Sequence, residues 1–180
     1  MGFTDGALRL LSDYMIKAAQ DRPDHIAFLY GEQRITYREF AQQVEKLACY
    51  LLKLGVQKGD RLAYLMTPRP EFFYVYMAAS RIGAIIVGIG TRQSNKEIEY
   101  VLNNSEAIAI FTLHSMYEFD YQERFEKILP NCPSVTHVLI VGGPVKMENA
   151  LSFDEIMQGD YSEYLPALLE RDAQVSTHDG

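Results

Sequence analysis

The chain has 180 residues and a formal net charge of −7, with 48% hydrophobic and 23% charged residues. These proportions are ordinary for a globular protein with its own core, and the negative charge, without a basic stripe, argues against nucleic-acid binding. No apolar run reaches the length of about 18 residues that would indicate a membrane-spanning helix.

The first third of the chain predicts a helix, a hairpin and a second helix. Apolar residues recur at helical spacing over residues 7–19, and residues 25–37 indicate two short strands around a turn. Thr36 and Glu39 have the spacing of a capping box, which predicts the start of the second helix. Gly55 suits the position just beyond the end of that helix.

From residue 61 onward, strands and helices alternate. Strands are expected at 61–66, 84–89, 107–112 and 136–143, and helices at 70–82, 95–104 and 121–129, with a second capping box at Ser94 and Glu97. Residues 84–89 are apolar and largely β-branched, which is typical of a strand covered on both faces. After Gly143 the pattern weakens: residues 152–158 suggest a short helix, and residues 166–180 thin into polar residues.

This alternation predicts an α/β fold with a mostly parallel sheet and helices on both faces. No linker, repeat or shift in composition marks an internal boundary, so we interpret residues 1–180 as a single domain.

Three glycines around the run at 84–87 raise the question of a nucleotide-binding loop. A dinucleotide loop needs a third glycine where Gln93 stands, and the next strand lacks the expected acidic residue. The other phosphate loop, G-x-x-x-x-G-K-[ST], fails because no lysine follows Gly88. We therefore interpret Gly83 as the end of a helix, and Gly88 and Gly90 as the exit of the chain from the sheet.

Three segments, "ITYREF", "LGVQKGDRLAYLM" and "SRIGAIIVGIG", stand in this order with consistent spacing. They resemble motifs of the N-terminal region of the adenylate-forming (AMP-binding) superfamily, which includes acyl-CoA synthetases, peptide-synthetase adenylation domains and luciferases. The resemblance covers roughly residues 8–142. The sequence departs from the family pattern at Gly88, where proline is usual, and at Gly90-Thr91, where Asn-Pro is common.

The resemblance implies a ligase that uses ATP and Mg²⁺ to convert a carboxylic acid, which we expect to be a fatty acid, to an acyl-adenylate. The acyl group then passes to coenzyme A. The family's Ser/Thr/Gly-rich phosphate loop, its adenine, ribose and magnesium motifs, and its C-terminal domain with a catalytic lysine are not found in these 180 residues. We therefore expect residues 1–180 to be an N-terminal fragment of the AMP-binding domain, inactive alone, without a catalytic residue or bound cofactor. An apolar face left uncovered in such a fragment would favour homo-oligomers.

Arg92 follows the glycine stretch at the expected edge of the sheet, and it is the candidate contact for a phosphate of coenzyme A. The alternative is a solvated arginine in a loop. His114 is expected at the carboxyl end of a strand, where open α/β sheets bind ligands, with a structural role as its alternative. The charged residues of 117–127 are most simply a solvated helix face.

No cysteine or histidine spacing predicts a metal site. The isolated Cys49 and Cys132, with no signal-peptide pattern, favour a reducing, cytoplasmic location. Three alternatives to the fatty-acid ligase stay open. They are a non-catalytic α/β domain for binding or association, an adenylating enzyme for aryl or amino acids, and, ranked last, a nicotinamide dehydrogenase.

Overall fold

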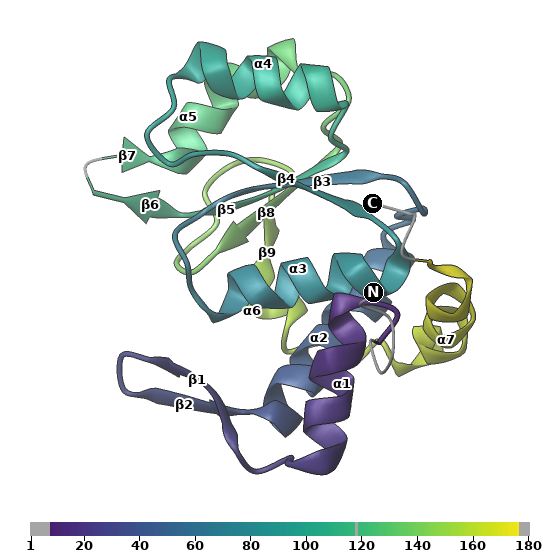
Figure 1. Cartoon of the computed structure of the whole chain (residues 1–180). Coiled ribbons are helices and arrows are strands. Elements are labelled where there is room, and N and C mark those ends of the chain that lie inside the picture. Colours follow the sequence, from purple (N-terminus) through teal and green to yellow (C-terminus); the bar gives the residue numbers. More distant parts are fainter. Residues whose placement is uncertain (1–7, 118, 177–180) are drawn as a thin grey trace, which may run out of the picture. The chain divides into compact units, whose positions relative to one another are not determined.

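The computed structural model describes residues 8–117 and 119–176, and the contacts within the chain divide it into two compact units (Figure 1). Unit 1 is built from segments within 1–59, 73–84 and 161–180, and unit 2 from 60–72 and 85–160. Unit 1 contains α1 (Leu11–Asp21), β1 (Ile26–Tyr30), β2 (Gln33–Thr36), α2 (Tyr37–Lys53), most of α3 (Pro70–Ile82), η2 (Ser162–Tyr164) and α7 (Leu165–Gln174). Unit 2 contains β3 (Arg61–Leu65), β4 (Ile85–Gly88), α4 (Asn95–Ser105), β5 (Ala109–Leu113), β6 (Ser115–Met116), β7 (Phe119–Asp120), α5 (Tyr121–Ile128), η1 (Leu129–Asn131), β8 (His137–Val141), β9 (Leu151–Ser152) and α6 (Phe153–Ile156).

The centre of unit 2 is a five-stranded sheet in the order β4-β3-β5-β8-β9, in which all neighbouring strands are parallel. Within this unit, α4 and α5 lie on one face of the sheet and the short α6 on the other (Figure 1). Every residue of β5 is buried, and the Phe111 ring packs edge-on against the Phe153 ring at 6.2 Å. The predicted α/β fold with a mostly parallel sheet is confirmed.

One prediction about this sheet is wrong. The strand at β4 was expected to be covered on both faces, but it lies at the edge of the sheet with only β3 as a neighbour. Ile85 is 36% exposed, and Ile86 and Val87 are half-buried. Branched aliphatic residues indicate a strand, but the position of that strand depends on which other strands pair with it.

Both capping boxes form as the sequence predicts. Thr36 Oγ1 accepts a hydrogen bond from the Glu39 amide at 3.2 Å, and Glu39 Oε2 accepts one from the Thr36 amide at 2.8 Å. Ser94 and Glu97 make the same reciprocal pair at the start of α4, at 3.4 and 2.7 Å. These bonds satisfy amides that have no partner within the first helical turn.

The two capping carboxylates make the stability of the chain depend on pH. Hydrogen bonds from the backbone and then the hydroxyl of Thr36 and Ser94 lower the pKa of Glu39 and Glu97. Because the folded pKa is the lower one, this stabilisation is present above the pKa of the unfolded chain and is lost as the pH falls through the folded value. We expect the urea midpoint to drop on acidification below about pH 4, and to drop less in an E39Q/E97Q variant. Urea titrations at a series of pH values test this. The prediction is contradicted if the urea midpoints of the E39Q/E97Q variant and of the unsubstituted chain drop equally on acidification.

Unit 1 is organised around α2, whose buried face packs against α1 and α7. The β1–β2 hairpin is antiparallel as predicted, and the Phe28 ring lies 4.7 Å from that of Phe40 and 4.8 Å from that of Phe73. Two expectations are wrong at the ends of the chain. The first helix begins at Leu11, after the predicted start at Ala7, which lies outside the described residues. Residues 166–176, expected to thin into polar chain, contain most of α7, which buries Leu168 and exposes Leu169.

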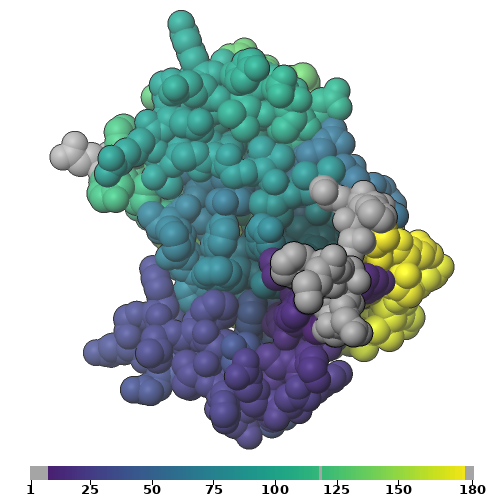
Figure 2. Space-filling view, viewed as in Figure 1, coloured from purple at the N-terminus to yellow at the C-terminus, as the bar shows by residue number. Residues whose placement is uncertain are grey.

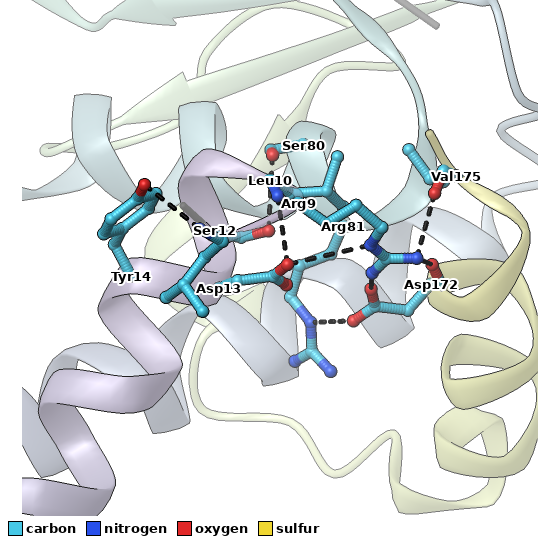
Figure 3. Close-up of polar contacts among 10 residues, drawn as sticks. Arg9, Leu10, Ser12, Asp13, Tyr14, Ser80, Arg81, Asp172 and Val175 are labelled. Carbon is cyan, nitrogen blue, oxygen red and sulfur yellow. Dashed lines mark hydrogen bonds and ion pairs between the residues drawn. The ribbon is translucent and has the colours of Figure 1, made fainter. Parts of the chain in front are cut away.

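A polar network joins α1, α3 and α7 within unit 1 (Figure 3). The carboxylate of Asp172 accepts hydrogen bonds from Arg81 Nε at 3.0 Å and from Arg9 Nη2 at 2.6 Å. Arg9 Nη1 also donates to the carbonyls of Asp172 and Val175, at 2.6 and 2.9 Å. The Arg81 side chain is only 5% exposed. This network brings the N-terminal residues next to α7, and Figure 2 shows purple N-terminal residues beside the yellow residues of α7 on the surface.

Candidate functional site

A pocket of about 590 Å³ lies in unit 2, beside the point where the chain leaves β4. It is formed by the turn after β4, the first turn of α4, the short strand β7 and one face of α5. Its lining residues are Thr91, Arg92, Gln93, Ser94, Asn95, Glu97, Phe119, Asp120, Glu123, Arg124 and Lys127.

The turn after β4 presents Arg92 to this pocket. The Gln93 amide donates to the Gly90 carbonyl at 3.1 Å, and Gln93 Oε1 accepts from the Gly90 amide at 3.0 Å. Arg92 lies within this turn and is exposed. The structure gives its guanidinium no hydrogen bond or ion pair among the residues it describes. The predicted candidate therefore lies in a pocket with its charge available, while the ligand assigned to it stays a prediction.

Two residues of α5 hold the turn from the opposite wall. Arg124 Nε donates to Asn95 Oδ1 at 2.6 Å, and Arg124 Nη2 donates to the Gln93 carbonyl. The hydroxyl of Tyr121, which is fully buried, donates to the Thr91 carbonyl at 3.0 Å. Burial also raises the pKa of Tyr121, so this hydroxyl keeps its proton over the neutral range.

The lining contains three basic and three acidic side chains, and three of these six already have partners. Glu97 caps α4, and Arg124 bonds to the turn. Burial alone would raise the pKa of Asp120, but hydrogen bonds from the amides of Glu123 and Gln122 and from Lys146 outweigh it and the pKa is lowered. Asp120 is therefore an ionised helix cap bonded to Lys146 at 3.3 Å. The lining residues whose charges have no such partner in the described part of the chain are Arg92, Lys127 and Glu123.

The sequence interpretation missed the role of Arg124. Residues 117–127 were expected to present a solvated helix face, which holds for the exposed Glu123, Glu126 and Lys127. It is wrong for Arg124, which is half-buried and bonds to residues 29 and 31 positions earlier. No motif relates residues at such a distance, so only the folded chain shows this contact.

His114 lies at the end of β5, as predicted, but it is not among the residues that line the pocket. Its ring packs directly against Gly143, where an added Cβ would lie 2.1 Å from His114 Cδ2. Its Nδ1 is buried and has no hydrogen-bond partner in the described structure. These contacts favour a packing role for His114.

No group of three or more His, Cys, Asp or Glu side chains that could hold a metal ion occurs in residues 8–117 and 119–176. Cys49 and Cys132 are buried free thiols. None of the helices in the same part of the chain is long and apolar enough to cross a membrane.

The sequence profile of the AMP-binding enzyme family matches residues 16–175. A medium/long-chain-fatty-acid–CoA/3-oxocholest-4-en-26-oate–CoA ligase of Mycobacterium marinum is 28% identical over 131 residues, which cover 73% of this chain and 22% of that protein. The 4-hydroxybutyrate–CoA ligase 2 of Metallosphaera sedula is 27% identical over 160 residues, which cover 85% of this chain and 28% of that protein.

A crystal structure described as a long-chain-fatty-acid CoA ligase of Rhodopseudomonas palustris superposes with a TM-score of 0.73 at 27% identity, covering 82% of this chain and 36% of that one. The chain thus spans 22% to 28% of the length of the two curated relatives. Its fold, its motifs and the family profile agree over most of its residues, and the chain belongs to the AMP-binding enzyme family.

Proposed function

We propose that this chain is the N-terminal part of an acyl-CoA ligase, and that residues 1–180 belong to its AMP-binding domain. The observation that carries the proposal is the family match over residues 16–175. The fold supports it, because the parallel sheet of unit 2 has the architecture of the ligases to which the chain is similar.

The proposed reaction has two steps. A carboxylate oxygen of the acid attacks the α-phosphorus of ATP, and pyrophosphate leaves with the electrons of the broken P–O bond. The thiol of coenzyme A then attacks the acyl carbon, and AMP leaves, so that the products are a thioester, AMP and pyrophosphate. We propose that Mg²⁺ accompanies ATP in this reaction, and we assign none of the described residues to it.

We propose a fatty acid as the substrate. The relatives from Mycobacterium marinum and Rhodopseudomonas palustris are named for medium- or long-chain fatty acids, which supports this choice for the present chain. Arg92 is our proposed contact for a phosphate of coenzyme A, because it carries an available charge on the wall of the unit 2 pocket. Homo-oligomers stay a prediction, supported by the half-exposed aliphatic residues of the edge strand β4.

ATP–pyrophosphate exchange by the full-length product of the encoding gene tests the proposal. The acids to compare are acetate, octanoate, palmitate, benzoate and an amino acid, each followed by an assay for the coenzyme A thioester. We expect the fastest exchange with octanoate or palmitate, and none with the 180-residue chain alone. Exchange with benzoate or the amino acid only would correct the substrate class. Absence of exchange and of thioester with every acid would overturn the function.

A further inference from the structure

The turn that carries Arg92 is held in place by a residue from a different element. Arg92 lies between two backbone carbonyls, those of Thr91 and Gln93, that accept hydrogen bonds from Tyr121 and Arg124 of α5. The same Arg124 guanidinium also bonds to Asn95, the first residue of α4. Both sides of Arg92 are thus fixed to α5, although the turn itself lies on the surface and contains Gly90.

Several contacts restrain the Arg124 side chain. Its guanidinium lies 5.6 Å from the ring centroid of Phe119 and 5.7 Å from that of Tyr121, a distance at which a cation is attracted to an aromatic face. Tyr121 is fully buried, and the capping carboxylate of Asp120 fixes the start of α5. A side chain that contacts two rings and donates to two acceptors loses little further freedom when a ligand binds beside it.

The two arginines of the pocket therefore differ in what they can offer a ligand. Arg124 uses Nε and Nη2 on Asn95 and Gln93, whereas Arg92 has no such partner in the described residues. We infer that Arg124 is a positioning residue, which holds the Gly90–Gln93 turn so that Arg92 is oriented for an anionic group of the thiol acceptor. This inference rests on the proposed acyl-CoA ligase function.

The test uses steady-state kinetics of the full-length enzyme, with coenzyme A, ATP and the acid varied separately. Arg92→Ala and Arg124→Ala are each expected to raise the KM for coenzyme A about 10-fold, the effect of losing one charge-assisted hydrogen bond, with kcat and the KM for ATP nearly unchanged. The double variant is expected to show about the same 10-fold increase, because Arg124 acts through Arg92. Lys96→Ala is the control. It removes an exposed charge from the first turn of α4 that does not line the pocket, and its kinetic constants are expected to equal those of the unsubstituted enzyme.

Two further measurements separate the possible results. With dephospho-coenzyme A, the effects of both variants should disappear if the 3′-phosphate is the anion, and persist if the pyrophosphate is. In the 180-residue chain, Arg124→Ala should speed hydrogen exchange at the amides of residues 91–95 about 10-fold and leave β5 unchanged.

Several results would overturn the inference. A double variant with an increase of about 100-fold would mean that Arg124 acts independently of Arg92. An equal loss of kcat for all substrates, or unchanged exchange at residues 91–95, would show that Arg124 does not position the turn. If the unsubstituted enzyme forms no thioester from any acid, the proposed function and the ligand named here both fail, and the exchange measurement still decides whether Arg124 holds the turn.

Discussion

Replacing Gly143 by alanine is expected to lower the free energy of unfolding of the chain by about 3 kcal/mol. Gly143 has a φ of +86°, which is unfavourable for any residue with a side chain, and an added Cβ would lie 2.1 Å from Cδ2 and 2.8 Å from Cγ of His114. His114 directly follows the fully buried strand β5, so the backbone that carries the ring is held in place. Urea unfolding followed by far-ultraviolet circular dichroism measures the loss.

Gly90 provides the matched control for this substitution. Its backbone lies outside the left-handed region, and an added Cβ would meet Gln93 at an ordinary 3.6 Å. Gly90→Ala is therefore expected to change the stability by less than about 0.5 kcal/mol. Removing the ring in a His114→Ala, Gly143→Ala double variant should restore the part of the loss that comes from the clash. A Gly143→Ala variant as stable as the Gly90→Ala variant would refute this account.

Asp172→Ala is expected to destabilise the chain by about 3 kcal/mol, because it removes the shared acceptor of two arginines. Asp172 is 14% exposed and Arg81 only 5%, so Arg81 would be left with Glu45, whose Oε2 is 3.7 Å from its Nη1. A buried guanidinium without a close acceptor has lost its hydrogen bonds to water, and no hydrogen bond within the protein replaces them. The same urea titration, with the midpoint and slope compared between variants, measures the effect.

An exposed ion pair on α1 serves as the control for Asp172. Lys17 and Asp21 are 59% and 57% exposed, so Asp21→Ala should cost less than about 0.5 kcal/mol. A variant that replaces both charges, Arg81→Met with Asp172→Leu, should recover most of the stability that Asp172→Ala loses. If Asp172→Ala costs no more than Asp21→Ala, the network does not fasten α7.

The parts of the fold that could be predicted from the sequence depend on short-range chemistry. Each capping box needs only two residues three positions apart, and both occur as expected. Gly83 ends α3 with a φ of +71°, which its lack of a side chain allows. The alternation of apolar strands with amphipathic helices led in the same way to the parallel sheet of unit 2.

The features that could not be predicted depend on contacts between distant residues. The edge position of β4 depends on the pairing of other strands, and α7 buries little more than Leu168, too short an apolar stripe to recognise. The candidate site shows the same division. Arg92 could be selected because it follows a strand, but Arg124 could not, because its partners are Asn95 and Gln93.

The bond between Arg9 and Asp172 has a consequence for the order in which the chain folds during synthesis. The two residues are 163 positions apart, so unit 1 cannot complete its polar network until almost all of these residues have left the ribosome. The sheet of unit 2 needs nothing beyond β9, which ends at Ser152. We therefore expect the sheet to assemble first, while the part of α2 that packs against α7 stays uncovered and accessible to chaperones.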